Sequence, residues 1–398
     1  MKILQEAYIV AATRSPIGKA PKGMLRNTRP DDLLAQALKH ALTQVPSLDP
    51  AAIEDAIVGC AIPEAQQGLN VARMGVLLSG LPQSVGGITV NRFCASGLSA
   101  VAMAADRIRV GQADLMIAAG VESMSMVPMM GNTPSISPSV FTQDENFGIA
   151  YGMGLTAEEV ANRWKVSRED QDAFALASHQ KAIAAQTHGD FDREIFDVNV
   201  ATRVMNADQG TIDVQWNKFS KDEGPRIDTS LAGLAKLKTV FAKHGSVTAG
   251  NSSQMSDGTG VLILASEKAV NMFGLTPLAK FLSFAVRGVP PEIMGIGPKE
   301  AIPAALKTAG LRQEDIDWIE LNEAFAAQAL AVTRDLNLDP SKINPLGGAI
   351  ALGHPLGATG AIRSATVVHA LQRKQLKYGM VTMCVGTGMG AAGIFERV

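Results

Sequence analysis

The stretch VNRFCASGLSAVAMAA at residues 90–105 decides how the chain is organised. Residues 88–90 are apolar and predict the end of a strand, and Cys94 follows almost at once. The small residues after Cys94 predict a helix that packs tightly inside the protein. Cys94 is therefore expected at a strand-to-helix junction, where free backbone N–H groups and the helix dipole lower the pKa of a thiol and make it a nucleophile. The alternative is a buried, inert cysteine.

The length and composition predict a protein with full cores and more than one domain. The 398 residues are 46% hydrophobic, and the formal net charge of −2 gives no electrostatic indication of nucleic-acid binding. The three cysteines, at positions 60, 94 and 384, are odd in number and widely spaced. This spacing indicates neither a disulfide framework nor a metal site, and it favours a reducing, cytoplasmic setting. Cys60 is expected to be structural.

The N-terminal sequence and the hydropathy pattern predict neither a signal peptide nor a membrane span. The first six residues are interrupted by Gln5 and Glu6, so they lack the apolar core of a signal peptide. Apolar runs stay below the ~18 residues of a membrane-spanning helix.

The second half of the chain repeats the order of the first half. A predicted helix at 31–42 has a counterpart at 298–310, and a predicted strand at 115–119 has one at 378–384. The stretch at 346–360 occupies the place of the Cys94 unit. The offset stays near ~260 residues, which indicates two copies of one α/β unit. Because each copy alternates strands and helices, a sheet covered by helices on both faces is expected.

Residues 122–247 interrupt the repeat and predict an inserted loop or lid domain. They begin with loops rich in Met, Pro and Ser, continue with an amphipathic helix from 167 to about 186, and end in polar, turn-rich sequence. His179 and His188 on or near that helix are expected to be solvated. The predicted domains are residues 1–121 with 248–270, the insertion at 122–247, and residues 271–398.

Three further stretches carry candidate catalytic residues. GGAIALGHPLGATG at 347–360 holds His354 in a glycine-rich turn, although many buried histidines only satisfy hydrogen bonds. MCVGTGMG at 383–390 puts Cys384 before a turn with free N–H groups, which suit an oxyanion or, alternatively, a nucleotide. NEAFA at 322–326 puts Asn322 before an apolar helix, where a helix cap is the alternative.

Taken together, NRFCASG at 91–97, NEAFA, GGAIALGHP and CVGTGMG resemble the four signatures of the thiolase family, in the family's order. Residues 249–254 and 289–295 also resemble the degradative 3-ketoacyl-CoA thiolases, so the resemblance covers essentially the whole chain. It implies an acetyl-CoA C-acyltransferase that cleaves 3-ketoacyl-CoA with CoA in fatty acid β-oxidation. The implied fold is α/β, with two repeated units in α-β-α-β-α layers and an inserted loop domain.

The resemblance also implies a role for each residue. Cys94 would be the acylated nucleophile, His354 the base that takes its proton, and Cys384 the second acid and base. One oxyanion site would use His354 with a water on Asn322, and the other would use the backbone N–H groups of Cys94 and Gly386. The residues implied to contact CoA are Arg226, Ala249 and Ser253. The residues implied to line the acyl end are Met153, Met294 and Phe325.

Partners and competing functions follow from the same resemblance. Thiol chemistry suffices for the reaction, so no metal or redox cofactor is implied and CoA enters as a substrate. A homodimer or homotetramer, associated with other β-oxidation enzymes, is expected. The alternatives are an acetoacetyl-CoA thiolase working toward condensation, a ketoacyl synthase-like enzyme, and a non-catalytic lipid-binding or scaffold protein with this fold. Intact Cys94, His354 and Cys384 disfavour the scaffold.

Gly152 bears on the length of the acyl chain. The loop at 151–154 resembles Tyr-His-Met-Gly of the short-chain biosynthetic thiolases, which have a His where this chain has Gly152. The missing imidazole predicts a roomier site that accepts acyl chains of medium length or longer. The alternative is a turn glycine whose space another side chain fills.

Overall fold

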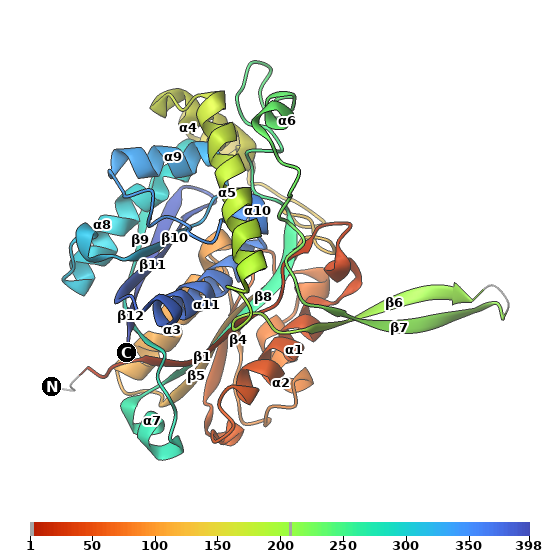
Figure 1. Ribbon diagram of the computed structural model, residues 1–398, viewed down its shortest axis with the longest axis vertical. Coiled ribbons are helices and arrows are strands. Elements are labelled where there is room, and N and C mark those ends of the chain that lie inside the picture. Colours follow the sequence, from red (N-terminus) through yellow and green to blue (C-terminus); the bar gives the residue numbers. More distant parts are fainter. Residues whose placement is uncertain (1–3, 207–208) are drawn as a thin grey trace.

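The computed structural model describes residues 4–206 and 209–398, and its centre is one large mixed sheet (Figure 1). The strand order is β10-β11-β12-β9-β1-β8-β5-β3-β4, and β2 pairs with β8. The strands of the first half are β1 (Tyr8–Arg14), β2 (Gly18–Lys19), β3 (Asp55–Gly59), β4 (Ile88–Val90), β5 (Leu115–Ser123) and β8 (Ser256–Ala265). Those of the second half are β9 (Ala279–Gly288), β10 (Trp318–Leu321), β11 (Tyr378–Val385) and β12 (Met389–Arg397).

The expected repeat is confirmed by the pairing of the strands. The order β3-β5-β8-β1 in the first half matches β10-β11-β12-β9 in the second, with the first pair parallel and the others antiparallel in both. Even β4, which runs parallel to β3, has a counterpart in the parallel bridge between Ile319 and Ile343. A short antiparallel contact, in which Ile9 pairs with Ala279, joins the two halves edge to edge.

Helices cover and separate the two halves of the sheet. The helices of the first half are α1 (Pro30–Thr43), α2 (Val71–Leu78) and α3 (Ser96–Arg109). Those of the second half are α7 (Glu267–Phe273), α8 (Gly297–Ala309), α9 (Ala326–Asp335), α10 (Ala349–Leu352) and α11 (Leu356–Lys374). Helices α3 and α11 pack against each other and against strands of both halves, while α1 and α8 cover opposite outer faces. The expected α-β-α-β-α layering is therefore confirmed.

The contact between α3 and α11 depends on small residues. A Cβ on Gly97 would collide with the backbone of Ala361, and one on Gly360 would collide with the backbone of Leu98. Only glycine permits such an approach of two helix backbones. Because both helices begin beside predicted catalytic residues, their close packing brings Cys94 and His354 into one region.

The segment 122–247 adds α4 (Met153–Trp164), α5 (Arg168–His188), α6 (Leu231–Ala235) and a ribbon of two strands, β6 (Val198–Asn206) and β7 (Thr211–Phe219). Helix α5 packs against α9 and α10, whereas the ribbon projects from the body (Figure 1). Residues 1–3 and 207–208, which the predicted domains include, lie outside the described residues.

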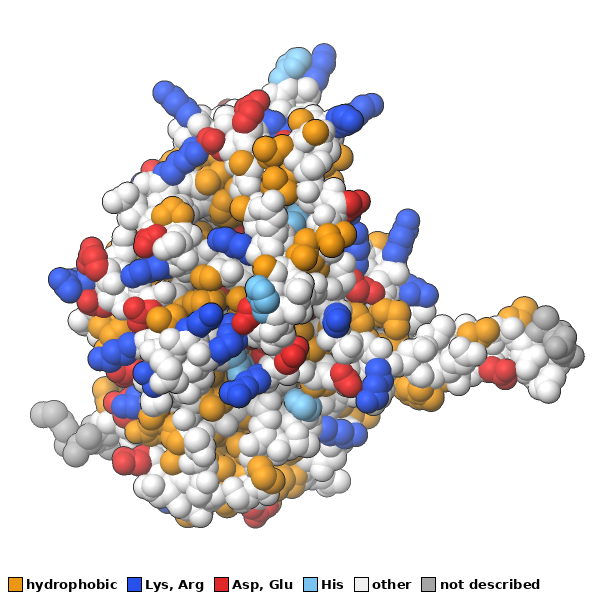
Figure 2. Space-filling view, in the orientation of Figure 1, with side chains coloured by type: hydrophobic (Ala, Val, Ile, Leu, Met, Phe, Trp, Pro, Cys, Tyr) orange, Lys and Arg blue, Asp and Glu red, His pale blue; other side chains and the backbone are white. Residues whose placement is uncertain are grey.

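The ribbon corrects the expectation of a turn-rich remainder after α5. Ile212, Val214 and Trp216 alternate along β7 and all reach solvent, and apolar side chains are visible on the ribbon surface (Figure 2). This alternation of apolar and polar residues is the pattern of a strand, so the sequence carried the signal although most of β7 is exposed. Among the described residues, no helix has both the length and the hydropathy needed to cross a membrane.

Candidate active site

Cys94 lies on a tight turn between β4 and α3. The 3-10 turn Phe93–Ala95 follows Val90 closely, and Phe93 adopts a φ of 43°, in the left-handed region that non-glycine residues rarely occupy. The turn is held by Ser96, whose Oγ donates to the carbonyl of Phe93 and accepts from the N–H of Arg92. The predicted strand-to-helix junction is confirmed, and the strained backbone indicates that its shape is maintained by packing.

His354 lies between α10 and α11, on a turn that only glycine allows. Gly353 has a φ of +106°, and a Cβ there would collide with Ser256. The N–H of His354 donates to the carbonyl of Gln254 and to Ser256 Oγ. The imidazole is 5% exposed, and its Nδ1 lies 2.6 Å from Thr359 Oγ1. The ring is therefore fixed on one side, and its other nitrogen is left for the site.

Asn322 faces that other nitrogen instead of capping a helix. It follows β10 directly, while α9 begins four residues later at Ala326. Its Nδ2 lies 3.4 Å from Nε2 of His354. Within the described part of the chain, the buried Oδ1 of Asn322 has no hydrogen-bond partner. The alternative of a helix cap is thus wrong, because the side chain points toward His354.

Cys384 and Gly386 lie at the turn between β11 and β12. Thr387 and Gly388 both have positive φ, which lets the two strands turn back within three residues. The backbone N–H groups of Gly386 and of Cys94 itself lie near the sulfur of Cys94 and act to lower its pKa. Cys384 is fully buried and close enough to Cys94 for that thiolate to raise its pKa. The two cysteines and the expected N–H pair therefore share one small space.

The pKa of Cys94 corrects an expectation from the sequence. Burial raises it to about 12, and the two N–H donors offset only part of that shift. Burial also raises the pKa of Cys384 and lowers that of His354 to about 3, with the Arg363 charge adding to the latter shift. Desolvation outweighs the helix terminus because it disfavours every charged form in the site. At neutral pH all three side chains are uncharged.

The residues expected at the acyl end lie beside Cys384. Met294 and Phe325 form a buried apolar cluster with Cys384, and Met153 packs against it. Met153 also approaches Gly386, because its sulfur lies 3.8 Å from the position of a Cβ on that glycine. An apolar wall thus borders the thiols.

Comparison with known proteins shows the family to which the chain belongs. Residues 7–268 match the family model described as "Thiolase, N-terminal domain", and residues 275–397 match "Thiolase, C-terminal domain". The chain belongs to the thiolase family. It is 50% identical to the 3-ketoacyl-CoA thiolase of Bacillus subtilis (strain 168), covering 99% of this chain and 100% of that one. It is 46% identical to the peroxisomal 3-ketoacyl-CoA thiolase of Homo sapiens, covering 98% and 91%.

Solved structures of thiolases have the same fold over the whole chain. The human mitochondrial 3-ketoacyl-CoA thiolase aligns with a TM-score of 0.89 at 38% identity, and the Bacillus anthracis acetyl-CoA acetyltransferase aligns with 0.88 at 37%. Both alignments cover 100% of both chains.

The residues expected to contact CoA lie on accessible segments of this thiolase. Arg226 and Ala249 are exposed, and Ser253 is half-buried, with its N–H bonded to the carbonyl of Ala324. The side chain of Gln254 donates to the carbonyl of Gly224, which links the Ser253 segment to the Arg226 segment. The two segments therefore border the same side of the thiolase.

His179 is not solvated, contrary to the expectation, whereas His188 is exposed. The Nδ1 of His179 accepts a hydrogen bond from the N–H of Arg226 at 3.1 Å. Burial, with the Arg226 charge, lowers the pKa of His179 to about 4. Helical periodicity did not predict this, because the residue that covers His179 lies outside its helix.

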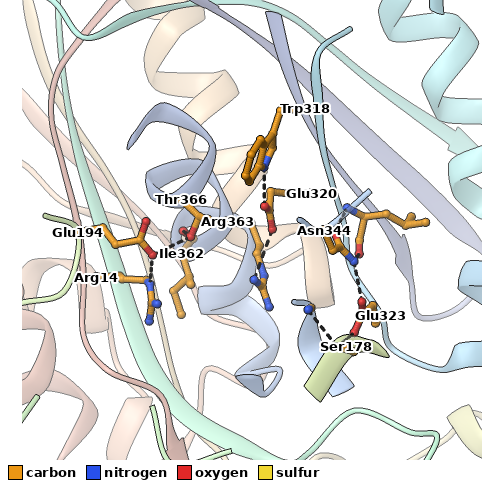
Figure 3. A network of polar contacts seen from close by, with 12 residues as sticks. Arg14, Ser178, Glu194, Trp318, Glu320, Glu323, Asn344, Ile362, Arg363 and Thr366 are labelled. Carbon is orange, nitrogen blue, oxygen red and sulfur yellow. Dashed lines mark hydrogen bonds and ion pairs between the residues drawn. The ribbon is translucent and has the colours of Figure 1, made fainter. Parts of the chain in front are cut away.

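A buried network of polar contacts was not predicted from the sequence (Figure 3). Arg14 of β1 pairs with Glu194 and Asp222 of the inserted segment, so that segment is tied to the central sheet. Glu323 accepts from Ser178 and from the N–H of Ile350, which starts the turn that carries His354. Removing one partner of such a pair leaves an uncompensated buried charge.

Glu122 links the two halves of the protein, and Cys60 packs beside its carboxyl group. Glu122 Oε2 accepts from the N–H groups of Ala61, at 2.7 Å, and Gly357, at 2.8 Å. Cys60 is fully buried 3.8 Å from this carboxyl group, and its pKa is raised by burial, which fits the expected structural role. Within residues 4–206 and 209–398, no cluster of His, Cys, Asp and Glu is arranged to hold a metal ion.

Proposed function

We propose that this thiolase cleaves 3-ketoacyl-CoA with CoA, giving acetyl-CoA and a shortened acyl-CoA, as an acetyl-CoA C-acyltransferase of fatty acid β-oxidation. The observation that carries the proposal is the packing of the Phe93–Ala95 turn, which holds Cys94, against both β11, which contains Cys384, and α11, which begins just after His354. Relatives named 3-ketoacyl-CoA thiolase, similar over nearly the whole chain, support the choice of substrate.

In the first half-reaction, Cys94 attacks the 3-keto carbon while Nε2 of His354 takes the thiol proton. The bond between C2 and C3 then breaks, and the thiol of Cys384 protonates C2 of the departing acetyl-CoA enolate. The imidazolium N–H of His354 donates to the enolate oxygen. A water that donates one hydrogen to Oδ1 of Asn322 supplies the second donor, which suits the unpartnered oxygen of that side chain.

In the second half-reaction, the thiolate of Cys384 takes the proton of the CoA thiol. The CoA sulfur attacks the acyl group on Cys94, and the N–H groups of Cys94 and Gly386 stabilise the tetrahedral oxyanion. Cys94 leaves as a thiolate and recovers its proton from His354. Because the resting groups are uncharged, each charge forms only within the reaction. CoA is a substrate here, and the chemistry requires no metal or redox cofactor.

The test is the CoA-dependent loss of absorbance of the magnesium complex of a 3-ketoacyl-CoA, with the products separated by chromatography. We expect one acetyl-CoA and one acyl-CoA shortened by two carbons for each substrate consumed. A protein that binds the substrate but leaves it intact would support the scaffold alternative. Turnover confined to acetoacetyl-CoA would support the acetoacetyl-CoA thiolase.

The surroundings of Gly152 support the proposal that the enzyme accepts acyl chains longer than four carbons. Its φ of −64° and ψ of 149° suit any residue, so the backbone does not require glycine there. Among the described residues, no heavy atom lies within 4 Å of the position that a Cβ would take. The alternative, that another side chain fills the space, is therefore disfavoured. Gly152 is exposed, and its neighbour Met153 packs against the apolar cluster that contains Cys384.

Replacing Gly152 by His should shorten the acceptable chain. We expect the wild type to turn over C8 3-ketoacyl-CoA well, and Gly152→His to lower kcat/KM for C8 by about 10–100-fold relative to C4, since bulk in a pocket changes discrimination by about 1–3 kcal/mol. Gly152→Ala is the control and should keep the wild-type ratio. Equal C8 turnover by wild type and Gly152→His would show that Gly152 does not set chain length.

Assembly, location and domain division are also part of the proposal. We infer a homodimer or homotetramer, a cytoplasmic location, and association with other β-oxidation enzymes. Light scattering after size-exclusion chromatography measures the first of these. The division into 1–121 with 248–270, 122–247 and 271–398 is supported by the repeated strand order, and limited proteolysis at its boundaries tests it.

A further inference from the structure

The side of His354 that faces away from Asn322 has one dedicated partner. Thr359, in the first turn of α11, is 1% exposed, and its Oγ1 lies 2.6 Å from Nδ1 of His354. Ser364, another buried hydroxyl on the same helix, donates backward to the carbonyl of Gly360. Thr359 instead directs its hydroxyl toward the histidine.

The two hydrogen-bond partners together select one protonation state of the ring. Nδ2 of Asn322, a donor, faces Nε2 of His354 at 3.4 Å. A nitrogen that faces a donor must offer a lone pair, so the ring proton belongs on Nδ1, where Thr359 Oγ1 accepts it. The opposite tautomer would bring two hydrogens together between His354 and Asn322. This proton assignment follows from the hydrogen-bond network.

We propose that Thr359 is a positioning residue that holds His354 as the neutral Nδ1–H tautomer, with the Nε2 lone pair directed at the proton of Cys94. The inference rests on the proposed function, because it specifies how the base of that reaction is prepared. Without the threonine hydroxyl, the ring loses the partner that orients it and that selects its tautomer.

The surroundings of His354 make its hydrogen bond to Thr359 important. His354 is desolvated, and Arg363, one helical turn beyond Thr359, brings a positive charge that Glu320 of β10 partly balances. Both features oppose an imidazolium, while the thiols of Cys94 and Cys384 add no charge at rest. The Nδ1–H bond to Thr359 strengthens when the ring becomes charged, since hydrogen bonds to ions are the stronger ones. Thr359 therefore stabilises the state that His354 must reach.

The experiment is alkylation of Cys94 by iodoacetamide, followed by peptide mass spectrometry between pH 6 and 10 in the absence of any CoA substrate. The variants are Thr359→Val, which keeps the shape but removes the hydroxyl, Thr359→Ser, which restores it, and His354→Ala as the reference. Ser364→Ala is the matched control, because it removes a buried hydroxyl from the same helix without contacting His354. Thermal denaturation of each variant reports folding.

We expect Thr359→Val to slow alkylation at pH 7.5 by about 10–100-fold, within the range of general-base effects. Its rate should rise about tenfold per pH unit, as for His354→Ala, because hydroxide alone then forms the thiolate. Thr359→Ser should recover most of the wild-type rate and pH profile, and Ser364→Ala should keep both.

The outcomes separate this inference from the proposed function. If His354→Ala is alkylated at the wild-type rate, His354 is not the base, and the proposed mechanism fails. If His354→Ala is slow while Thr359→Val keeps the wild-type rate and profile, the mechanism stands and the role of Thr359 is refuted. A Thr359→Ser variant as slow as Thr359→Val would also refute it, since packing and not the hydroxyl would then matter.

Discussion

Replacing Cys94 by Ala is expected to lower kcat/KM for thiolysis by about 10⁴-fold or more, the scale seen when a covalent nucleophile is removed. The sulfur is the only atom proposed to bond to the acyl group, and two N–H donors converge on its position. The measurement is a chain-length series of 3-ketoacyl-CoA substrates with each protein.

The adduct on Cys94 gives an independent check of the same role. Mixing the wild type with a 3-ketoacyl-CoA in the absence of CoA should leave one acyl group on the peptide that contains Cys94. Intact-mass and peptide mass spectrometry after acid quenching detect it. Cys60→Ala is the control and should retain the adduct, since Cys60 packs against Glu122. An acyl group found on Cys384 or Cys60 would overturn the assignment.

Replacing Cys384 by Ser should separate the two chemical steps. Serine is a much weaker acid than a thiol, so protonation of the enolate and activation of CoA should slow by about 10²–10⁴-fold. Acylation of Cys94 from acetyl-CoA should persist but be slow, because His354 still takes the proton of Cys94 while serine is a poor proton donor to the departing CoA thiolate. The measurement is exchange of the α-protons of acetyl-CoA with deuterium oxide, followed by NMR or mass spectrometry.

The contrast with His354→Ala makes that experiment decisive. His354→Ala should impair acylation itself, whereas Cys384→Ser should accept an acyl group and fail in exchange. Wild-type exchange in Cys384→Ser would show that another group moves the α-proton. Equal loss of acylation in both variants would show that the two residues do not divide the steps as proposed.

Local sequence was sufficient for much of the architecture and for the identity of the candidate residues. The repeat was predictable because strands and helices are specified by short-range patterns, and the same patterns recur at a steady offset. The junction at Cys94, the turn at His354 and the turn after Cys384 were predictable because glycine and small residues mark places where the backbone must bend or pack closely. The family signatures lie on these same turns.

Tertiary structure decided the electrostatics and the hydrogen-bond partners. The pKa of Cys94 was expected to fall because its own helix lies next to it along the chain, but burial by the rest of the protein raises it. His179 was expected in solvent, yet the segment of Arg226 covers it. The β6–β7 ribbon was missed although apolar and polar residues alternate along β7, and its base is buried in the core through Val198, Val200 and Phe219.

The separation in sequence between interacting residues explains which features were predictable and which were not. Whether a segment turns or forms a helix depends on neighbours within a few residues, so the sequence was sufficient for most of the elements and for the catalytic candidates. Desolvation and hydrogen bonding depend on which distant segments meet. The contact of α3 with α11, and of Asn322 and Thr359 with opposite sides of His354, exists only after folding. The protonation state of the site was therefore decided by packing between residues far apart in sequence.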